Sequence, residues 1–236
     1  MKRSVSLLLL ALSCFVTATA GDAVKAVLFP FRETILSARV ESTLAAYKFR
    51  IGEKFDKGAE LTNLNDTVYA LKFKQRTKQL DFARVVYHEK KELRANNYTS
   101  DLELNKAEFD YNMASLACEE ARFDLESCKI TAPFAGKLVE MLTREYETVR
   151  PGQQICRIID DHSLLAVMNV PQKQLPAPGA AVSIVLDGSK QKITGKVYEI
   201  SPQADHRTGT VRIRVIIDNS RGILRPGLTG ELCHAE

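Results

Sequence analysis

A long run of apolar and small residues, spaced alternately by three and four, dominates the middle of this sequence. It contains eight positions: Leu104, Ala107, Tyr111, Ala114, Cys118, Ala121, Leu125 and Cys128. This spacing presents one helix face to a partner helix and is typical of a coiled coil. Ser100 and Glu103 form a predicted capping box, in which the hydroxyl accepts from a free backbone N–H and the carboxylate reaches back. The sequence therefore predicts a helical arm that begins at Ser100.

A second, looser apolar pattern precedes this arm, between Leu61 and Leu93. Six of its ten seam positions are apolar and four are not: Leu61, Leu64, Val68, Leu71, Phe82 and Val85, against Gln75, Lys78, Glu89 and Glu92. Between the two patterns lie Asn96 and Asn97, which favour a turn. We predict two antiparallel helices of about 28 residues, roughly 40 Å long, joined at a tip near these asparagines. A hairpin is favoured over a compact bundle because no further helical segment follows to cover the remaining faces.

The segments on either side of the predicted hairpin repeat one another. A shift of 94 residues aligns apolar and glycine positions of the two: Val40 with Phe134, Leu44 with Leu138, Phe55 with Val149, Gly58 with Gly152, Leu61 with Ile155, and Leu64 with Ile158. Each half contains short strands around a Lys-Gly or Pro-Gly turn. We predict that both halves form one small sandwich, whose chain leaves to make the hairpin and then returns.

The last seventy residues are rich in β-branched residues and turn signals. Strands are predicted over residues 164–170, 181–186, 193–200 and 210–217, separated by turns that contain Gly, Pro and Asp. Short, evenly spaced strands separated by such turns favour a small β-barrel.

The N-terminus is typical of a secretory signal peptide. Lys2 and Arg3 precede a short apolar run over residues 5–16, and small residues allow cleavage after Ala20. A lipid anchor on Cys14 is disfavoured, because the residues before that cysteine fit a lipoprotein signal poorly. The mature chain is therefore expected in an oxidising compartment.

Composition and motifs exclude several classes of function. Lys plus Arg number 33 and Asp plus Glu number 29, so the net charge of +4 does not fit a strongly basic nucleic-acid binder. The sequence contains no Cys/His cluster with metal-ligand spacing, no nucleophile elbow and no phosphate-binding loop. We therefore predict no catalytic, cofactor-binding or metal-binding residues.

Four cysteines remain after the predicted cleavage site. Cys118 lies on the helical seam, where a small buried hydrophobe is expected. Cys128 ends the second arm and Cys156 lies on a strand of the same half-sandwich, so these two form a candidate disulfide whose geometry the sequence does not test.

Four segments in this order resemble a known family. They are residues 129–138, 149–155, 195–202 and 218–227, with the sequences KITAPFAGKL, VRPGQQI, GKVYEISP and DNSRGILRPG. Together with the order of predicted elements, they resemble the periplasmic adaptor subunits of bacterial efflux and secretion pumps, the membrane fusion proteins of the HlyD family. The resemblance covers roughly residues 24–233.

The resemblance implies an α+β, mainly β fold. A lipoyl-type barrel-sandwich domain would be split by an antiparallel α-helical coiled-coil hairpin and followed by a small β-barrel. The implied division is a signal peptide (1–20), the first half of the sandwich (21–62), the hairpin (63–128), the second half of the sandwich (129–161) and the barrel (162–236). Because the chain ends directly after the barrel, we expect the barrel itself to face the pump.

The resemblance also implies partners and a site. A non-enzymatic, cofactor-free periplasmic adaptor would form a ring of several copies, link an inner-membrane transporter to an outer-membrane channel, and bind no nucleic acid. A pump of the resistance–nodulation–division (RND) type is expected first and an ATP-driven exporter second. The hairpin tip would dock on the channel through Glu89, Leu93, Asn96, Asn97 and Ser100. Leu93 and Ser100 match the family's Arg-x-x-x-Leu-x-x-x-x-x-x-Ser spacing, but Glu89 stands at the arginine position.

Two alternatives from other classes remain at this point. A carrier with a lipoyl-like fold would need a modified lysine on a short turn, whereas Lys57 lies in a different turn and is expected to be an ordinary surface lysine. A structural protein of the cell envelope would use the hairpin for contacts with its own copies.

Overall fold

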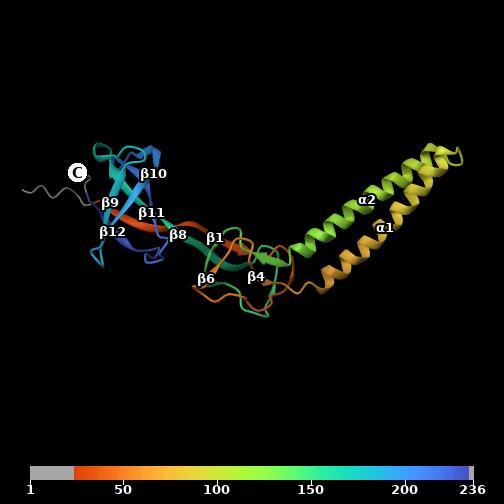
Figure 1. Ribbon diagram of the computed structural model, residues 1–236, viewed down its shortest axis with the longest axis horizontal. Coiled ribbons are helices and arrows are strands. Elements are labelled where there is room, and N and C mark those ends of the chain that lie inside the picture. Colours follow the sequence, from red (N-terminus) through yellow and green to blue (C-terminus); the bar gives the residue numbers. More distant parts are fainter. Residues whose placement is uncertain (1–23, 234–236) are drawn as a thin grey trace, which may run out of the picture. The chain divides into compact units, whose positions relative to one another are not determined.

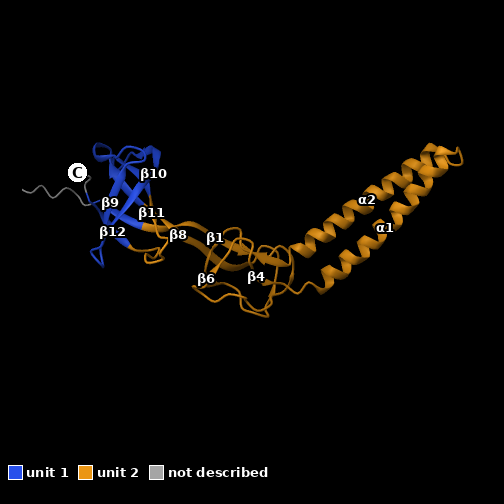
Figure 2. Ribbon diagram, viewed as in Figure 1, with its two compact units in different colours: residues 1–27, 167–215, 229–236 blue, residues 28–166, 216–228 orange. Residues whose placement is uncertain are grey.

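The computed structural model describes residues 24–233 of the chain, so the predicted signal peptide and Cys14 lie outside the described residues. The described chain forms two compact units (Figure 2). Unit 1 includes residues 24–27, 167–215 and 229–233, and unit 2 includes residues 28–166 and 216–228. Three strands, β1, β8 and β11, contribute residues to both units. Within residues 24–233, no helix has the length and apolar character that a membrane span requires.

Unit 2 is built on strand pairs that the two halves of the repeat exchange. The four short strands are β2 (Ser42–Thr43), β3 (Lys54–Phe55), β6 (Gly136–Met141) and β7 (Thr148–Val149). Strand β2 pairs with β7, where Ser42 faces Val149, and β3 pairs with β6, where Phe55 faces Gly136. The two registers are related by the predicted shift of 94 residues, since 42 + 94 = 136 and 55 + 94 = 149. The predicted repeat is confirmed, and each half completes its pairing with strands of the other half.

The turns of the two halves are equivalent as well. Gly58 and Gly152 have backbone φ angles of +84° and +86°, which favour glycine. The backbone N–H of Gly58 donates to the carbonyl of Ala132, and that of Gly152 donates to the carbonyl of Ala38, both at 2.8 Å. Each Lys-Gly or Pro-Gly turn is therefore hydrogen-bonded to the opposite half through its glycine N–H.

The core of unit 2 lies between these halves. Aligned positions of the repeat are both fully buried in it, including Leu44 with Leu138 and Leu61 with Ile155. Tyr47 packs against this core, and its hydroxyl lies 2.9 Å from the carbonyl oxygens of Thr143 and Ile155. Burial raises the pKa of Tyr47, so this hydroxyl stays a neutral donor.

The base of the helical segment is closed by backbone pairing. Strand β4 (Glu60–Asn63) pairs with β5 (Lys129–Thr131), and the Leu64 N–H donates to the Cys128 carbonyl at 2.8 Å. Between these strands run α1 (Thr67–Ala95) and α2 (Asp101–Glu126), which Figure 1 shows as two long helices joined at one end.

The contacts between the helices establish that they are antiparallel. Residues in contact have numbers that add up to nearly the same value, as in Lys72–Asp124, Thr77–Cys118, Tyr87–Tyr111 and Lys90–Glu103. On α2 the predicted seam is confirmed, because all its positions are buried or half-buried, with Ala107, Cys118 and Ala121 the most enclosed.

On α1 the predicted seam is wrong. Its apolar members on the helix are exposed, with exposed fractions of 72% for Val68, 63% for Leu71, 72% for Phe82 and 55% for Val85. The half-buried face is shifted by one to two residues and includes Tyr69, Lys72, Phe73, Arg76, Thr77, Leu80, Tyr87 and Lys90. Long polar side chains occupy part of this face because their aliphatic stems pack while their charged ends pair with α2, as in the 2.9 Å contact of Lys72 with Asp124.

Unit 1 is made of strands alone, with one short 3-10 helix, η1 (Gln172–Gln174). It contains three whole strands and parts of three others that continue into unit 2. The whole strands are β9 (Ala181–Leu186), β10 (Lys192–Asp205) and β12 (Thr229–Cys233), and the shared ones are β1 (Lys25–Ser37), β8 (Gln154–Pro171) and β11 (Thr210–Asp218). They pair in the order β1-β12-β9-β10-β11-β8, and β1 also pairs with β8. Alternate residues are buried along β9 and β11, as period-two strands require.

Two of these strands escaped the sequence analysis. Strand β1 follows directly on the predicted signal peptide, and β12 has only five residues of weak alternation. Strand β8 is longer than predicted and runs without interruption across the predicted boundary at residues 161 and 162. The prediction of a mainly β fold with two helices is confirmed, whereas the coiled-coil and barrel assignments and the domain boundaries stay predictions.

The segment DNSRGILRPG is organised by one buried side chain. The Asn219 amide donates to the carbonyls of Asp161 and Leu224 at 2.8 and 2.9 Å, and its carbonyl accepts from the Leu224 N–H at 2.9 Å. The Asp161 carboxylate in turn pairs with Lys137. Asn219 therefore joins this loop to β8 inside unit 2.

A first prediction concerns the close approach of β6 to β8 at Gly136. A Cβ atom at this position would lie 2.1 Å from the Ile159 carbonyl oxygen, a separation that no side chain tolerates. We expect Gly136→Ala to lower the free energy of unfolding by about 2 kcal/mol or more, because backbone must shift on both paired strands. Gly188→Ala is the control, since nothing lies within 4 Å of its Cβ position. Equal denaturant midpoints for the two variants would contradict the prediction.

A second prediction separates the two apolar faces of the hairpin. Ala121 and Phe82 both belong to predicted seams, yet Ala121 is fully buried and Phe82 is 72% exposed. We expect Ala121→Glu to destabilise the protein by about 1–3 kcal/mol, because it places a carboxylate between the helices. Phe82→Glu should change stability by no more than about 0.5 kcal/mol. Thermal unfolding of both variants measures this, and a larger loss for Phe82→Glu would restore the predicted seam.

Candidate functional site

The connection between α1 and α2 is a defined helix-ending turn. Asn97 has a positive φ of 62°, and its N–H donates to the Arg94 carbonyl at 3.0 Å. The Tyr98 N–H donates to the Leu93 carbonyl at 2.8 Å. These two bonds make a Schellman motif, with asparagine in the left-handed position that glycine usually takes. The asparagine pair predicted to form a tip therefore ends α1 by a specific backbone geometry.

The start of α2 is capped by Ser100. Its hydroxyl accepts from the Glu103 N–H at 3.3 Å, which confirms one half of the predicted capping box. The other half differs, because the Glu103 carboxylate accepts from the Thr99 hydroxyl and from Lys90 Nζ, the latter at 2.8 Å. The carboxylate is drawn to α1 because an ammonium group offers it a charge-assisted bond.

Two ion pairs connect the helices at this end. Arg94 binds both carboxylate oxygens of Asp101, with 3.2 Å between Nη2 and Oδ2, and donates to the Asn97 side chain at 3.0 Å. Lys90 pairs with Glu103 at 2.8 Å. Arg94 lowers the pKa of Asp101, and Lys90 with Thr99 lowers the pKa of Glu103.

The direction of these pKa shifts sets the pH range in which the pairs act. Because both carboxyls have lowered pKa values, their contribution is complete above the ordinary carboxyl range and is lost as the pH falls through the lowered values. Both carboxylates are exposed and the side chains of Lys90 and Arg94 are about one-third exposed, so the pairs orient the turn more than they stabilise the fold.

The five predicted tip residues lie close to this turn in sequence and in space, with Asn96, Asn97 and Ser100 in the connection itself. Leu93 is 40% exposed, and Glu89 lies one helical turn before it on an exposed face of α1. Asn96 also donates from its side chain to the Glu92 carbonyl at 3.0 Å. Their role in binding another protein stays a prediction.

Sequence reasoning missed Tyr98, whose side chain is 79% exposed at the end of the hairpin. It also missed the Arg94–Asp101 pair. The signal was present, because an aromatic residue and two opposite charges flank the asparagine turn, and large side chains on exposed loops are frequently functional.

A second missed feature is an apolar stripe on the outer face of α2. Its members are spaced by seven residues and are 59–78% exposed: Leu102, Phe109, Leu116 and Phe123. Seven-residue spacing keeps them on one face of the helix, away from the seam that packs on α1. The exposed apolar residues of α1, which the spacing predicted as its seam, form a comparable stripe, so each helix has an apolar face that the described chain leaves uncovered.

The candidate disulfide residues both lie in the core of unit 2. Cys128 and Cys156 are free, buried thiols, and burial raises the pKa of each to about 11. Protonated thiols are poor nucleophiles, so both cysteines are unreactive in this state. Their pairing stays a prediction. Cys118 is a buried seam residue, as predicted, and contacts the Thr77 hydroxyl at 3.6 Å.

Within residues 24–233, no three or more His, Cys, Asp and Glu side chains gather in a group that could hold a metal ion. The His162 ring lies 3.3 Å from the carboxylate of its neighbour Asp160.

Comparison with known proteins identifies the barrel-like C-terminal part. Residues 166–235 match the family described as the CusB-like β-barrel domain, of RND type. Nodulation protein NolF of Rhizobium meliloti is 25% identical over 226 residues, which cover 85% of this chain and 59% of NolF. Cation efflux system protein CzcB of Alcaligenes sp. is 27% identical over 209 residues, which cover 80% of this chain and 40% of CzcB.

The fold has solved counterparts. A MacA–MexA chimeric protein containing the Pseudomonas aeruginosa MexA α-hairpin domain superposes with a TM-score of 0.78 at 20% identity, over 90% of this chain and 78% of the other. The chain thus spans about half the length of the curated relatives it matches. The resemblance to periplasmic adaptors of RND-type efflux systems, expected from the sequence, is confirmed by these matches.

Proposed function

We propose that this chain is a non-enzymatic periplasmic adaptor, which links an RND-type transporter in the inner membrane to a channel in the outer membrane. It would need no cofactor and would bind no nucleic acid. The transporter would supply the energy for export, and the adaptor would supply reach and contact surfaces.

The observation that carries this proposal is the hairpin, which has two uncovered apolar faces and an end held by a Schellman turn and two ion pairs. Its helices of 29 and 26 residues are each roughly 40 Å long at ~1.5 Å per residue. A hairpin that served only to complete a core would bury its apolar residues, whereas here Phe82, Phe109 and Phe123 are all more than half exposed. Exposed apolar stripes of this length favour contact with other proteins.

The proposal assigns a role to each part of the chain. Residues 63–128 would form a coiled-coil hairpin that carries the docking tip. Residues 162–236 would form a small β-barrel that faces the transporter, and the CusB-like match over residues 166–235 supports this. The lipoyl-type sandwich, formed by residues 21–62 and 129–161, would hold the base of the hairpin.

Within the tip, Leu93, Asn96, Asn97 and Ser100 would contact the channel, with Glu89 in place of the family's arginine. Ser100 is tied to the helix cap and Leu93 is 40% exposed, so an apolar contact at Leu93 is the stronger candidate. The carboxylate of Glu89 would require a channel with a complementary charge.

A third prediction tests docking at the tip. We expect Leu93→Glu to abolish capture of an outer-membrane channel in intact cells, because a carboxylate replaces the apolar contact. A photo-crosslinking residue at Tyr98, which is 79% exposed and donates only its backbone N–H to the turn, would serve as the probe. The captured protein is then identified by mass spectrometry.

Lys106→Glu is the control, since Lys106 is exposed on α2 beyond the turn and should leave capture intact. Unchanged capture by Leu93→Glu would overturn the docking assignment. Capture of no envelope transport protein by the unsubstituted chain would overturn the adaptor proposal itself.

A fourth prediction concerns assembly of several copies. The exposed stripes on α1 and α2 would pack between neighbouring copies, and together Phe82 and Phe109 contribute two of the largest exposed side chains. We expect the mature chain to self-associate at micromolar concentration in analytical ultracentrifugation. The double variant Phe82→Glu/Phe109→Glu should stay monomeric, because like charges would meet where apolar surface was buried.

Gln75→Glu/Asn105→Glu is the matched control, since it adds the same two charges at exposed positions of the same helices without removing an aromatic ring. If the control and the double variant dissociate equally, charge alone explains the effect and the stripes are not the interface. If the unsubstituted chain is monomeric at all concentrations tested, the stripes do not drive assembly on their own.

A further inference from the structure

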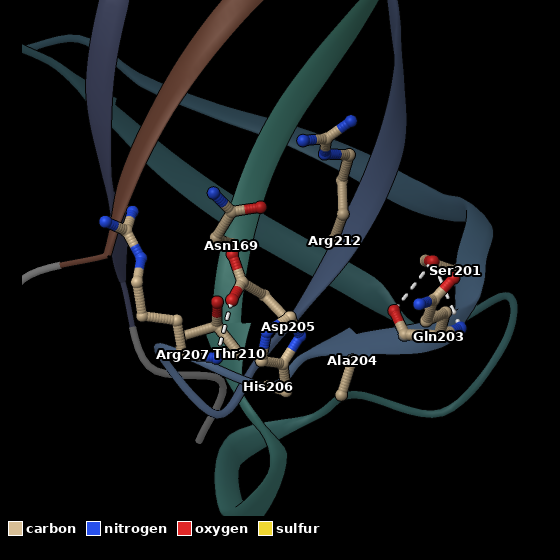
Figure 3. Close-up of a pocket in the computed structure, with 9 residues that line it drawn as sticks. All are labelled: Asn169, Ser201, Gln203, Ala204, Asp205, His206, Arg207, Thr210 and Arg212. Atoms are coloured by element: carbon tan, nitrogen blue, oxygen red, sulfur yellow. Dashed lines mark hydrogen bonds between the residues drawn. The ribbon is translucent and has the colours of Figure 1, made fainter.

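Unit 1 contains an open pocket of about 450 Å3, beside the turn that connects β10 to β11 (Figure 3). This volume lies within the range of ligand pockets, roughly 300–1,000 Å3. Its lining includes Asn169 of β8, the turn residue Arg207, and Thr210 and Arg212 of β11. The pocket lies wholly within one compact unit, and none of the proposed contacts of the hairpin involves it.

The turn that shapes the pocket is held by Asp205. Its carboxylate accepts from the backbone N–H groups of Arg207 and Thr208 at 2.8 and 3.3 Å. The Gly209 N–H donates to the Asp205 carbonyl at 2.7 Å, and Gly209 has a φ of +65°. The charge of Asp205 is therefore engaged by the backbone of its own turn, and Arg207 lines the pocket.

The two arginines differ from their neighbour in having no acidic partner. Arg214, on the same strand as Arg212, pairs with Glu199 at 2.9 Å. In the described part of the chain, neither Arg207 nor Arg212 has a carboxylate oxygen within 4.0 Å. Asp205 is the one carboxylate among the lining residues, so the pocket has more positive than negative side chains.

We propose that this pocket binds an anion that carries a phosphate group. A guanidinium group presents parallel N–H donors that match two oxygens of a phosphate. The Asn169 amide also lines the pocket and offers a further donor. A tetrahedral phosphate has enough free oxygens to bind both arginines and the amide, whereas a carboxylate has only two.

Two sources could supply such a group, namely a phospholipid headgroup or a soluble phosphate ester. The pocket is open to solvent and is lined by exposed side chains, so both can enter. The inference does not rest on the proposed function, because it uses only contacts within unit 1.

The test uses the full mature chain at low ionic strength. Glycerol 3-phosphate is the soluble probe, measured by isothermal calorimetry against acetate. Vesicles of phosphatidylglycerol are the lipid probe, measured by co-sedimentation against vesicles of phosphatidylcholine. We expect binding of at least one phosphate probe, weakened about tenfold or more by Arg207→Gln and by Arg212→Gln, because each removes charge-assisted hydrogen bonds.

Lys192→Gln is the charge-matched control, since Lys192 is exposed on β10 and does not line the pocket. Arg212→Lys keeps the charge but loses the paired donors, so its affinity should lie between those of the unsubstituted chain and Arg212→Gln. Binding of glycerol 3-phosphate would identify a site for soluble phosphates, and binding of anionic vesicles alone would identify a headgroup site.

Three results would overturn the proposal. The first is no binding of either probe, and the second is acetate binding as tight as that of glycerol 3-phosphate. The third is an equal loss of binding in Lys192→Gln, which would show attraction to general positive charge and no pocket. Circular dichroism of each variant confirms that the strands remain folded.

Discussion

The rest of unit 2 depends on the exchange of strands between two halves that lie 94 residues apart in sequence. Neither half holds a complete sheet, because β2 finds its partner in β7 and β3 finds its partner in β6. The chain must therefore return after the helices before the sandwich exists at all. Loop closure of this length costs little more than a short one, since the entropy grows only with the logarithm of loop length. A helical insertion of some sixty residues is thermodynamically compatible with so small a sandwich, provided that the base is closed by pairs such as Leu64 with Cys128.

Because the base is closed in this way, the stabilising contacts are distributed unevenly along the hairpin. At the base, backbone bonds and the fully buried Leu61 and Leu64 hold the chain in a dry core. At the far end, the Schellman turn and the Arg94–Asp101 pair are exposed to water and contribute little free energy. Small residues such as Ala107 and Ala121 lie between, and they let the helices approach closely. Stability is therefore concentrated where the hairpin meets the sandwich. Substitutions at the solvent-exposed end are expected to change the free energy of unfolding little.

Much of this arrangement could be predicted from the sequence, and the failures have physical causes. The repeat was visible because glycines with positive φ and buried leucines recur at fixed spacing, and the seam of α2 was visible because its contact face is uniformly small and apolar. The seam of α1 was not, because its contact face uses the stems of Lys72 and Arg76 while its better apolar pattern faces outward. The tip residues were located by the asparagine turn, and the charges of Arg94 and Asp101 flank it in sequence, whereas Lys90 and Glu103 come together only in the fold. The pocket of unit 1 was missed for the same reason, since Asn169 and Arg212 meet only through strand pairing.

The two apolar faces of α1 raise the question of what decides which one turns inward. The face that turns inward carries Tyr69, Phe73, Leu80 and Tyr87, so apolar burial favours it at least as much as it favours the face with Phe82 and Val85. Strands β4 and β5 fix the rotation of α1 at the base, and the pairs that Lys90 and Arg94 make with α2 at the tip are consistent with that rotation. In this rotation of α1, its large apolar side chains Phe82 and Val85 remain exposed to solvent. This exposed face of α1 is the surface that the proposed contact between neighbouring copies would bury.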